Sequence, residues 1–100
     1  MAFIMVTSTF PPYKSEEVGK LFTSNSLPKT ADFVKRINIF VLADGITKIY
    51  ALYEVPNEKL FDGMVSIATR YAGYRAVEGF EYKIENLLTI TEALPMVGLG

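Results

Sequence analysis

Apolar and polar positions alternate along four segments of this chain and recur at helical spacing along two others. Segment 3–10 is rich in β-branched and aromatic residues, and nearly every position at its start is apolar. This pattern is typical of a strand that is buried on both faces, so we expect segment 3–10 in the middle of a sheet. Pro11 and Pro12 end the strand, because neither has an N–H group to donate to a neighbouring strand.

A short amphipathic helix is expected after the two prolines. Ser15 is suited to cap its N-terminus, and two glutamates follow in the first turn, where the helix dipole favours negative charge. The apolar face of this helix consists of Val18, Leu21 and Phe22. Pro28 lies beyond its expected end.

Two alternating segments, 33–43 and 46–55, flank the dipeptide Asp44-Gly45. This dipeptide favours a two-residue type I′ turn, because both central positions of that turn need positive φ. The two segments therefore predict an antiparallel hairpin. The pairs expected on one face are Ala43–Ile46, Val41–Lys48, Ile39–Tyr50 and Ile37–Leu52, and those on the other are Leu42–Thr47, Phe40–Ile49, Asn38–Ala51 and Arg36–Tyr53. The first set is largely aliphatic and is expected to pack under the helices.

A second helix is predicted between Leu60 and Tyr71, where apolar residues recur at helical spacing. Asn57 is the expected N-cap residue, and Glu58 follows in the first turn. The cluster at the end of this helix is interpreted as cations that complement the helix C-terminus, with half-buried tyrosines between them. Its members are Arg70, Tyr71, Tyr74 and Arg75.

Segment 79–90 alternates again and predicts a fourth strand, with Phe80, Tyr82 and Ile84 on the side that faces the helices. The tail, residues 93–100, is apolar and carries no charged side chain. A free tail is normally polar, so this one is expected to pack on its own domain or on a partner.

The predicted order is strand-helix-strand-strand-helix-strand within a single domain that spans residues 1–100. One hundred residues can form one hydrophobic core but not two. Right-handed crossovers then give an α+β, ferredoxin-like βαββαβ fold, with a four-stranded antiparallel sheet in the order 4-1-3-2 and both helices on one face. The other face must meet water, a ligand or a second subunit.

Composition adds an expectation about partners. Hydrophobic residues make up 50% of the chain, and the mean hydropathy of +0.24 is high for a small domain, so we expect a homodimer that covers part of this surface. Lysine and arginine are scattered and the net charge is −1, which disfavours nucleic acid as a partner.

The longest strongly apolar run, 39–43, is too short for a bilayer, and the N-terminus lacks the features of a signal peptide. A cytoplasmic protein without membrane contact is expected.

The chain contains no cysteine and no histidine. This excludes disulfides, thiol nucleophiles, imidazole bases, histidine-ligated haem and ordinary zinc sites. Any metal would need oxygen ligands alone. Glycine-rich phosphate loops and nucleophile-elbow motifs are also missing from the sequence. We therefore expect neither a cofactor nor a metal.

The uncovered sheet face is the expected position of a binding site, because an apolar surface with a few convergent polar groups describes most small-molecule sites. The candidate ligand-binding residues on this face are Arg36, Asn38, Phe40 and Tyr53. The first strand adds either Met5, Thr7 and Thr9 or Ile4, Val6 and Ser8. In one interpretation Arg36 holds an anion, and Glu81 or Glu85 accepts a proton from a substrate. In the other, Arg36, Glu81, Lys83 and Glu85 form cross-strand ion pairs on a wet or interfacial surface.

Four segments of the sequence carry a resemblance to known proteins: Pro11-Pro12-Tyr13-Lys14-Ser15-Glu16-Glu17-Val18, Ala43-Asp44-Gly45-Ile46, Tyr53-Glu54-Val55, and Glu92-Ala93-Leu94 to Gly98-Leu99. Together they resemble a small uncharacterised bacterial family within the dimeric α/β-barrel superfamily. The resemblance implies two ferredoxin-like domains that pack sheet against sheet. Members of the superfamily include cofactor-independent monooxygenases, small lactone isomerases, haem-degrading enzymes and haem peroxidases. The haem branches fit poorly, because their usual histidine has no counterpart here.

Three functions remain open from the sequence. The first is a homodimeric small-molecule-binding protein with a pocket between paired sheets. The second is a cofactor-independent isomerase or monooxygenase that acts on a small apolar or anionic substrate. The third is a structural or regulatory interaction module. A pocket lined by a carboxylate with a raised pKa would favour the enzyme, whereas a pocket without such an acid would favour the binding protein.

Overall fold

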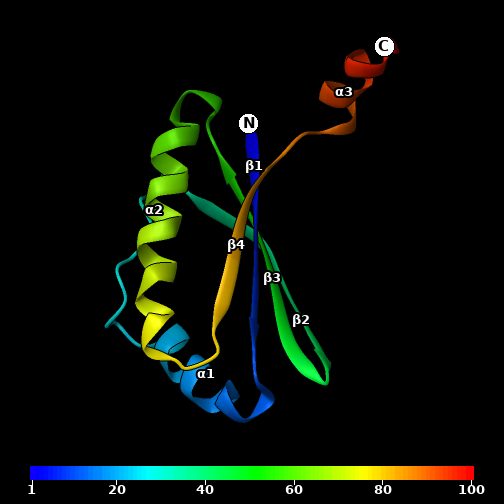
Figure 1. Cartoon of the computed structure of the whole chain (residues 1–100). Helices are drawn as coiled ribbons and strands as arrows, with labels where there is room; N and C mark the ends of the chain where they lie inside the picture. The colour runs from blue at the N-terminus through cyan, green and yellow to red at the C-terminus, as the bar shows by residue number, and fades with distance from the viewer.

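The computed structural model describes residues 1–100, and the elements follow the predicted order. They are β1 (Ala2–Phe10), α1 (Ser15–Thr23), β2 (Lys35–Asp44), β3 (Ile46–Val55), α2 (Leu60–Ala72), β4 (Glu81–Leu87) and α3 (Ile90–Ala93). The four strands form one antiparallel sheet in the order β2-β3-β1-β4 (Figure 1). This order confirms the predicted ferredoxin-like arrangement, with β1 and β3 in the centre.

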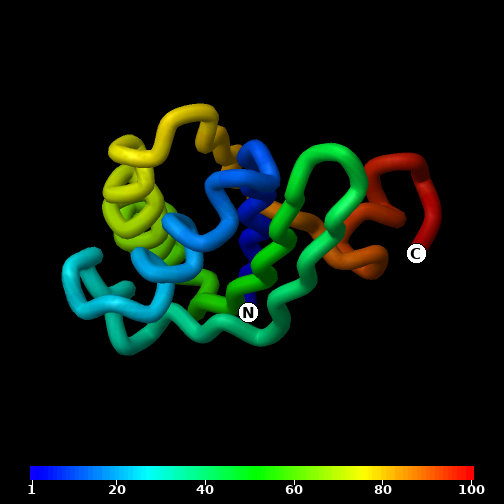
Figure 2. Tube along the Cα trace, turned by 90° about the horizontal axis from the view of Figure 1, so that it is seen from below, coloured from blue at the N-terminus to red at the C-terminus, as the bar shows by residue number.

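The core lies between one face of the sheet and the helices. Helices α1 and α2 lie on the same side of the sheet, and α1 runs between α2 and the β2–β3 hairpin (Figure 2). Alternate residues of the central strands point toward the helices, and Ile4, Val6 and Val55 have no exposed surface, like Ile67 of α2. Gly63 allows α2 to approach β3, because a Cβ atom there would lie only 2.8 Å from Val55 Cγ1. The other sheet face has no helix over it.

The register of the hairpin differs from the prediction by one residue. Asp44 pairs with Ile46 around Gly45 alone, which has φ of +73°, and Val41 pairs with Ile49. The predicted register would have placed the Lys48 ammonium under the helices, and burial of an unpaired charge is strongly unfavourable. The observed register keeps Lys48 on the uncovered face. Residues 39, 41 and 43 still face the helices as predicted, but opposite residues 51, 49 and 47.

An irregularity at Ile37 then restores the predicted pairing of Arg36 with Tyr53. Tyr53 is buried against the core, so both side chains lie on the face that the helices cover. The expectation that Arg36, Ile49 and Tyr53 lie on the uncovered face was therefore wrong. A one-residue change of register exchanges the two faces of a strand, because successive side chains point to opposite sides.

The two long helices begin differently from the prediction. Short 3₁₀ turns at Pro12–Lys14 and Asn57–Lys59 precede α1 and α2, and no side chain caps either helix by a hydrogen bond. The Ser15 hydroxyl instead donates to the Pro12 carbonyl oxygen at 2.7 Å. The predicted N-caps Ser15 and Asn57 are therefore wrong. None of the helices is both long enough and apolar enough to cross a membrane.

The C-terminal tail forms a short helical segment that projects beyond the sheet, away from α1 and α2 (Figure 1). Thr89 and Glu92 form a capping box at the start of α3: the Glu92 carboxylate accepts from the Thr89 N–H, and the Thr89 hydroxyl accepts from the Glu92 N–H. Ile90 and Met96 are more than 70% exposed, at 72% and 73%. The tail thus presents its apolar side chains to the surroundings.

Candidate functional site

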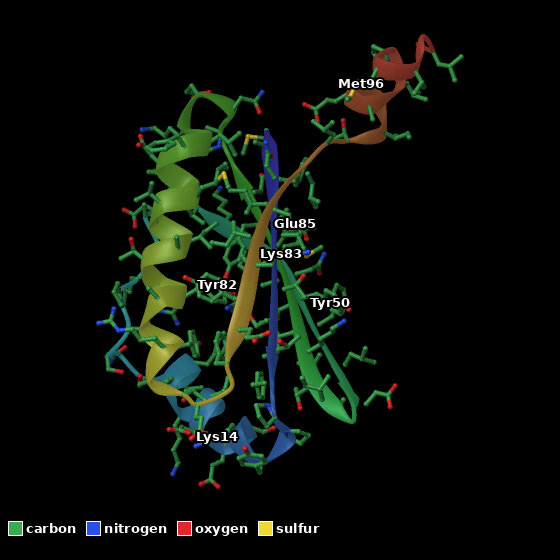
Figure 3. All side chains as sticks on the ribbon, in the orientation of Figure 1. Lys14, Tyr50, Tyr82, Lys83, Glu85 and Met96 are labelled. Atoms are coloured by element: carbon green, nitrogen blue, oxygen red, sulfur yellow. The ribbon has the colours of Figure 1, made fainter.

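The uncovered face carries a charged stripe along β4. Lys83 and Glu85 point away from the helices, as predicted, whereas Tyr82 points to the opposite side (Figure 3). Glu81 shares the face of Lys83 and Glu85, because it is two residues from Lys83 along β4. Their neighbours on β1 include Thr7 and Thr9. Of the two sets considered for β1, the one with Thr7 and Thr9 therefore lies on the uncovered face, and the one with Ser8 is buried under the helices. Together these residues line a shallow polar depression of about 290 Å³.

The charges on this stripe do not pair with one another. The two ion pairs of the chain are Lys14–Glu17 and Lys20–Glu16, both next to or within α1. The cross-strand ion pairs considered from the sequence are therefore not formed. Glu81 and Glu85, the candidate proton acceptors, are exposed side chains in an open depression.

The four predicted ligand-binding residues divide between the two faces of the sheet. Asn38 and Phe40 lie on the uncovered face, opposite Leu52 and Tyr50. Arg36 and Tyr53 lie together on the covered face, and the Arg36 guanidinium carbon sits 5.0 Å from the centre of the Phe22 ring. The structure therefore brings Arg36 and Tyr53 together and separates them from the other two.

An apolar pocket of about 380 Å³ opens between the covered face and α1. Small-molecule sites commonly measure about 300–1,000 Å³, so this pocket suits a small ligand. Most of its lining is hydrophobic. The lining residues are Ser8, Phe10, Ser15, Val18, Gly19, Phe22, Ile39, Val41, Ala43, Thr47, Ile49, Tyr71, Tyr74 and Phe80.

The pocket exists because α1 is short and lacks a side chain at Gly19. Only nine residues form α1, and a Cβ atom added at Gly19 would meet no other atom within 4 Å. The helix therefore leaves the sheet surface near the hairpin open, where Val41 remains 64% exposed. On the opposite wall, Phe10, Phe80 and Tyr74 stack, with the Tyr74 and Phe80 ring centres 4.6 Å apart.

The polar groups of the pocket are all hydroxyls. Ser8 and Thr47 line the pocket and are only 2% and 8% exposed, but no fully buried side-chain oxygen or nitrogen of the chain lacks a hydrogen-bond partner. The Tyr71 hydroxyl lies 3.1 Å from the Tyr53 hydroxyl and shares a hydrogen bond with it. No charged side chain lines the pocket. The site can therefore hold an apolar group and offer hydroxyl hydrogen bonds to it, but it contains no proton acceptor of carboxylate type.

The tyrosines beside the pocket remain protonated at neutral pH. Burial, followed by the neighbouring Tyr53 hydroxyl, holds the pKa of Tyr71 above its usual range. Burial also raises the pKa of Tyr74, while the Arg70 guanidinium opposes this shift. Both phenols therefore act as neutral hydrogen-bonding groups and not as bases.

This shift predicts a loss of stability in alkaline solution. Above pH about 10 the Tyr71 phenol ionises in the unfolded chain but not in the folded one, so the free energy of unfolding should fall by about 1.4 kcal/mol per pH unit. Below that pH the contribution of Tyr71 is fully present. Urea unfolding between pH 8 and 11 measures the slope, which should become shallower in Tyr71→Phe. An equal slope in Tyr71→Phe and in the exposed control Tyr13→Phe would disprove the assignment.

Sequence reasoning missed the pocket. Gly19 and Thr47 lie far apart in the chain, and neither belongs to a recognisable motif. The available signals were a glycine inside a helical segment and buried hydroxyls on strand faces that are otherwise apolar. No group of acidic side chains in the chain is arranged to hold a metal ion.

Comparison with known proteins adds no relative. The chain matches no protein-family model, and neither the curated proteins nor the solved structures contain a significant match. The structure shows a small α+β fold with ferredoxin-like sheet topology. Because no relative was found, the function must be inferred from the residues of this chain.

Proposed function

We propose that this protein is a cytoplasmic homodimer that binds a small, largely apolar molecule in the pocket between the sheet and α1. The observation that carries the proposal is the composition of this pocket. It combines an apolar lining with the hydroxyls of Ser8 and Thr47, two polar residues that are buried on the covered face of the sheet. A small, largely apolar molecule with one polar group suits such a lining, because small-molecule sites combine apolar walls with a few polar groups.

Binding is better supported than catalysis. An isomerase or a cofactor-independent monooxygenase needs a group that accepts a proton from its substrate. The pocket contains no carboxylate, and its tyrosines are held in the neutral form. Glu81 and Glu85 lie on the other side of the sheet, in the shallow depression beside β4. The protein therefore lacks an acid–base group where the apolar pocket could position a substrate.

The homodimer is supported by the large apolar side chains that remain exposed outside the pocket. Phe40 is 62% exposed and Leu42 is 48% exposed, and both lie on the uncovered face of β2. Contiguous apolar surface of this kind commonly marks an interaction site. The resemblance to the dimeric α/β-barrel superfamily supports a second copy of this chain as the partner. In such a dimer the two pockets would stay open on the outer, helix-covered sides.

Titration with the neutral fluorescent probe N-phenyl-1-naphthylamine tests the proposed function. The probe has about 17 non-hydrogen atoms, so a typical efficiency of about 0.3 kcal/mol per atom predicts a dissociation constant on the order of 100 µM or tighter. We expect saturable binding with one probe per chain and increased emission. Emission that rises linearly without saturation would reject a defined pocket.

A further inference from the structure

A polar cleft of about 420 Å³ adjoins the apolar pocket, and the Phe22 ring contributes to the walls of both. Three cationic side chains line this cleft: Lys29, Arg36 and Arg70. No aspartate or glutamate lines it, and its other polar groups are uncharged. The cleft therefore concentrates positive charge beside a pocket that has none.

The three cations have no carboxylate partner within the protein, since both ion pairs of the chain lie elsewhere. Arg70 is held by the last turn of α1 and the loop that follows it: its Nη2 donates to the Phe22 carbonyl oxygen at 3.4 Å and its Nη1 to the Pro28 carbonyl oxygen at 3.1 Å. Arg36 is stacked over the Phe22 ring, with 5.0 Å between the guanidinium carbon and the ring centre. Both guanidinium groups are thus positioned before any ligand arrives, and Arg36 and Lys29 make no hydrogen bond that an anion would have to displace.

A tyrosine pair lies between the two cavities. Tyr53 lines the cleft and Tyr71 lines the apolar pocket, and their hydroxyls lie 3.1 Å apart. One molecule could therefore place an apolar body in the pocket and a head group in the cleft. Guanidinium and ammonium groups bind carboxylates through charge-assisted hydrogen bonds, which are roughly twice as strong as neutral ones.

We propose that the natural ligand is amphipathic, with an apolar body in the pocket and a carboxylate head group held by Arg36 and Lys29. This inference rests on the proposed binding function and specifies the chemistry of its ligand. It also returns Arg36 to the role of an anion anchor, on the covered face of the sheet instead of the uncovered one. Tyr53 would lie beside the head group.

The test compares octanoate with octanamide, which share a chain and differ in the charge of the head group. Each is used to displace N-phenyl-1-naphthylamine from the protein at pH 7 and low salt. We expect octanoate to compete about tenfold more strongly than octanamide, from one charge-assisted contact. In the double variant Arg36→Gln with Lys29→Gln, this preference should disappear, so that octanoate competes no better than octanamide. Lys35→Gln removes a charge from the same strand on the opposite face and should change nothing.

Equal competition by the two molecules, or a preference that persists in the double variant, would overturn the carboxylate site and leave the apolar pocket standing. If the double variant lost probe binding, Lys29→Gln alone would decide the question, because Lys29 is an exposed side chain without a hydrogen bond to the fold. If the probe failed to bind the wild-type protein, the proposed apolar binding site would be rejected, independently of the result for the carboxylate site. Direct calorimetry with octanoate and octanamide would then still show whether the charged head group is recognised.

Discussion

Replacement of Gly19 with leucine is expected to weaken binding of N-phenyl-1-naphthylamine at least tenfold while the fold becomes more stable. Gly19 lies within α1 on the wall of the apolar pocket, and a Cβ atom there meets no atom within 4 Å. A leucine side chain would therefore extend into the space that the ligand needs. Leucine also has a higher helix propensity than glycine, so the free energy of unfolding should rise by about 0.5–1 kcal/mol. Fluorescence titration and urea unfolding measure the two effects separately.

Lys20→Leu is the matched control for this experiment. Lys20 is the next residue of α1, its side chain is 76% exposed, and its ion pair with Glu16 lies on the surface. The same new side chain at this position should leave probe binding unchanged. Undiminished binding in Gly19→Leu, with the helix intact, would place the ligand outside the pocket.

Replacement of Phe40 with glutamate is expected to convert the proposed homodimer into monomers. Phe40 is 62% exposed on the uncovered face of β2, next to Tyr50 of β3. A buried carboxylate without a partner destabilises an interface by several kcal/mol, so the dissociation constant should rise by about two orders of magnitude or more. Light scattering after size-exclusion chromatography at micromolar concentration measures the change in mass.

Phe61→Glu makes the same substitution at a position that is 77% exposed on α2, away from the uncovered sheet face. This variant should keep the mass of the wild type. A wild-type protein that is already monomeric at these concentrations would exclude the homodimer. Dissociation in Phe61→Glu but not in Phe40→Glu would move the interface to the helices.

The fold could be predicted from the sequence because its strands and helices have different hydrophobic periods. The alternating segments, the Asp44-Gly45 turn and the helical spacing between Leu60 and Tyr71 together define the element order and the sheet topology. The register could not be predicted in the same way. Asp44-Gly45 identifies a hairpin, but whether one or two residues stay unpaired depends on which face of β3 the helices cover. The irregularity at Ile37 has no sequence signal of its own.

The candidate site depends on that register, which is why half of it was misplaced. The pairing of Arg36 with Tyr53 was predicted correctly, but both residues lie on the covered face. The pocket beside them is formed by segments that are distant in the sequence, such as Ser8 of β1 and Gly19 of α1. Short-range patterns cannot reveal such a pocket, because its volume depends on how far a helix stands from the sheet.

The position of the bound probe tests the binding proposal most directly. Amide resonances of ¹⁵N-labelled protein can be followed while N-phenyl-1-naphthylamine is added. The proposal predicts the largest shift changes at Gly19, Phe22, Thr47 and Ile49, around the apolar pocket, and small changes at Lys83 and Glu85 on the uncovered face. Changes centred on β4 or on the C-terminal tail, with α1 unaffected, would show that the pocket between the sheet and α1 is not the binding site.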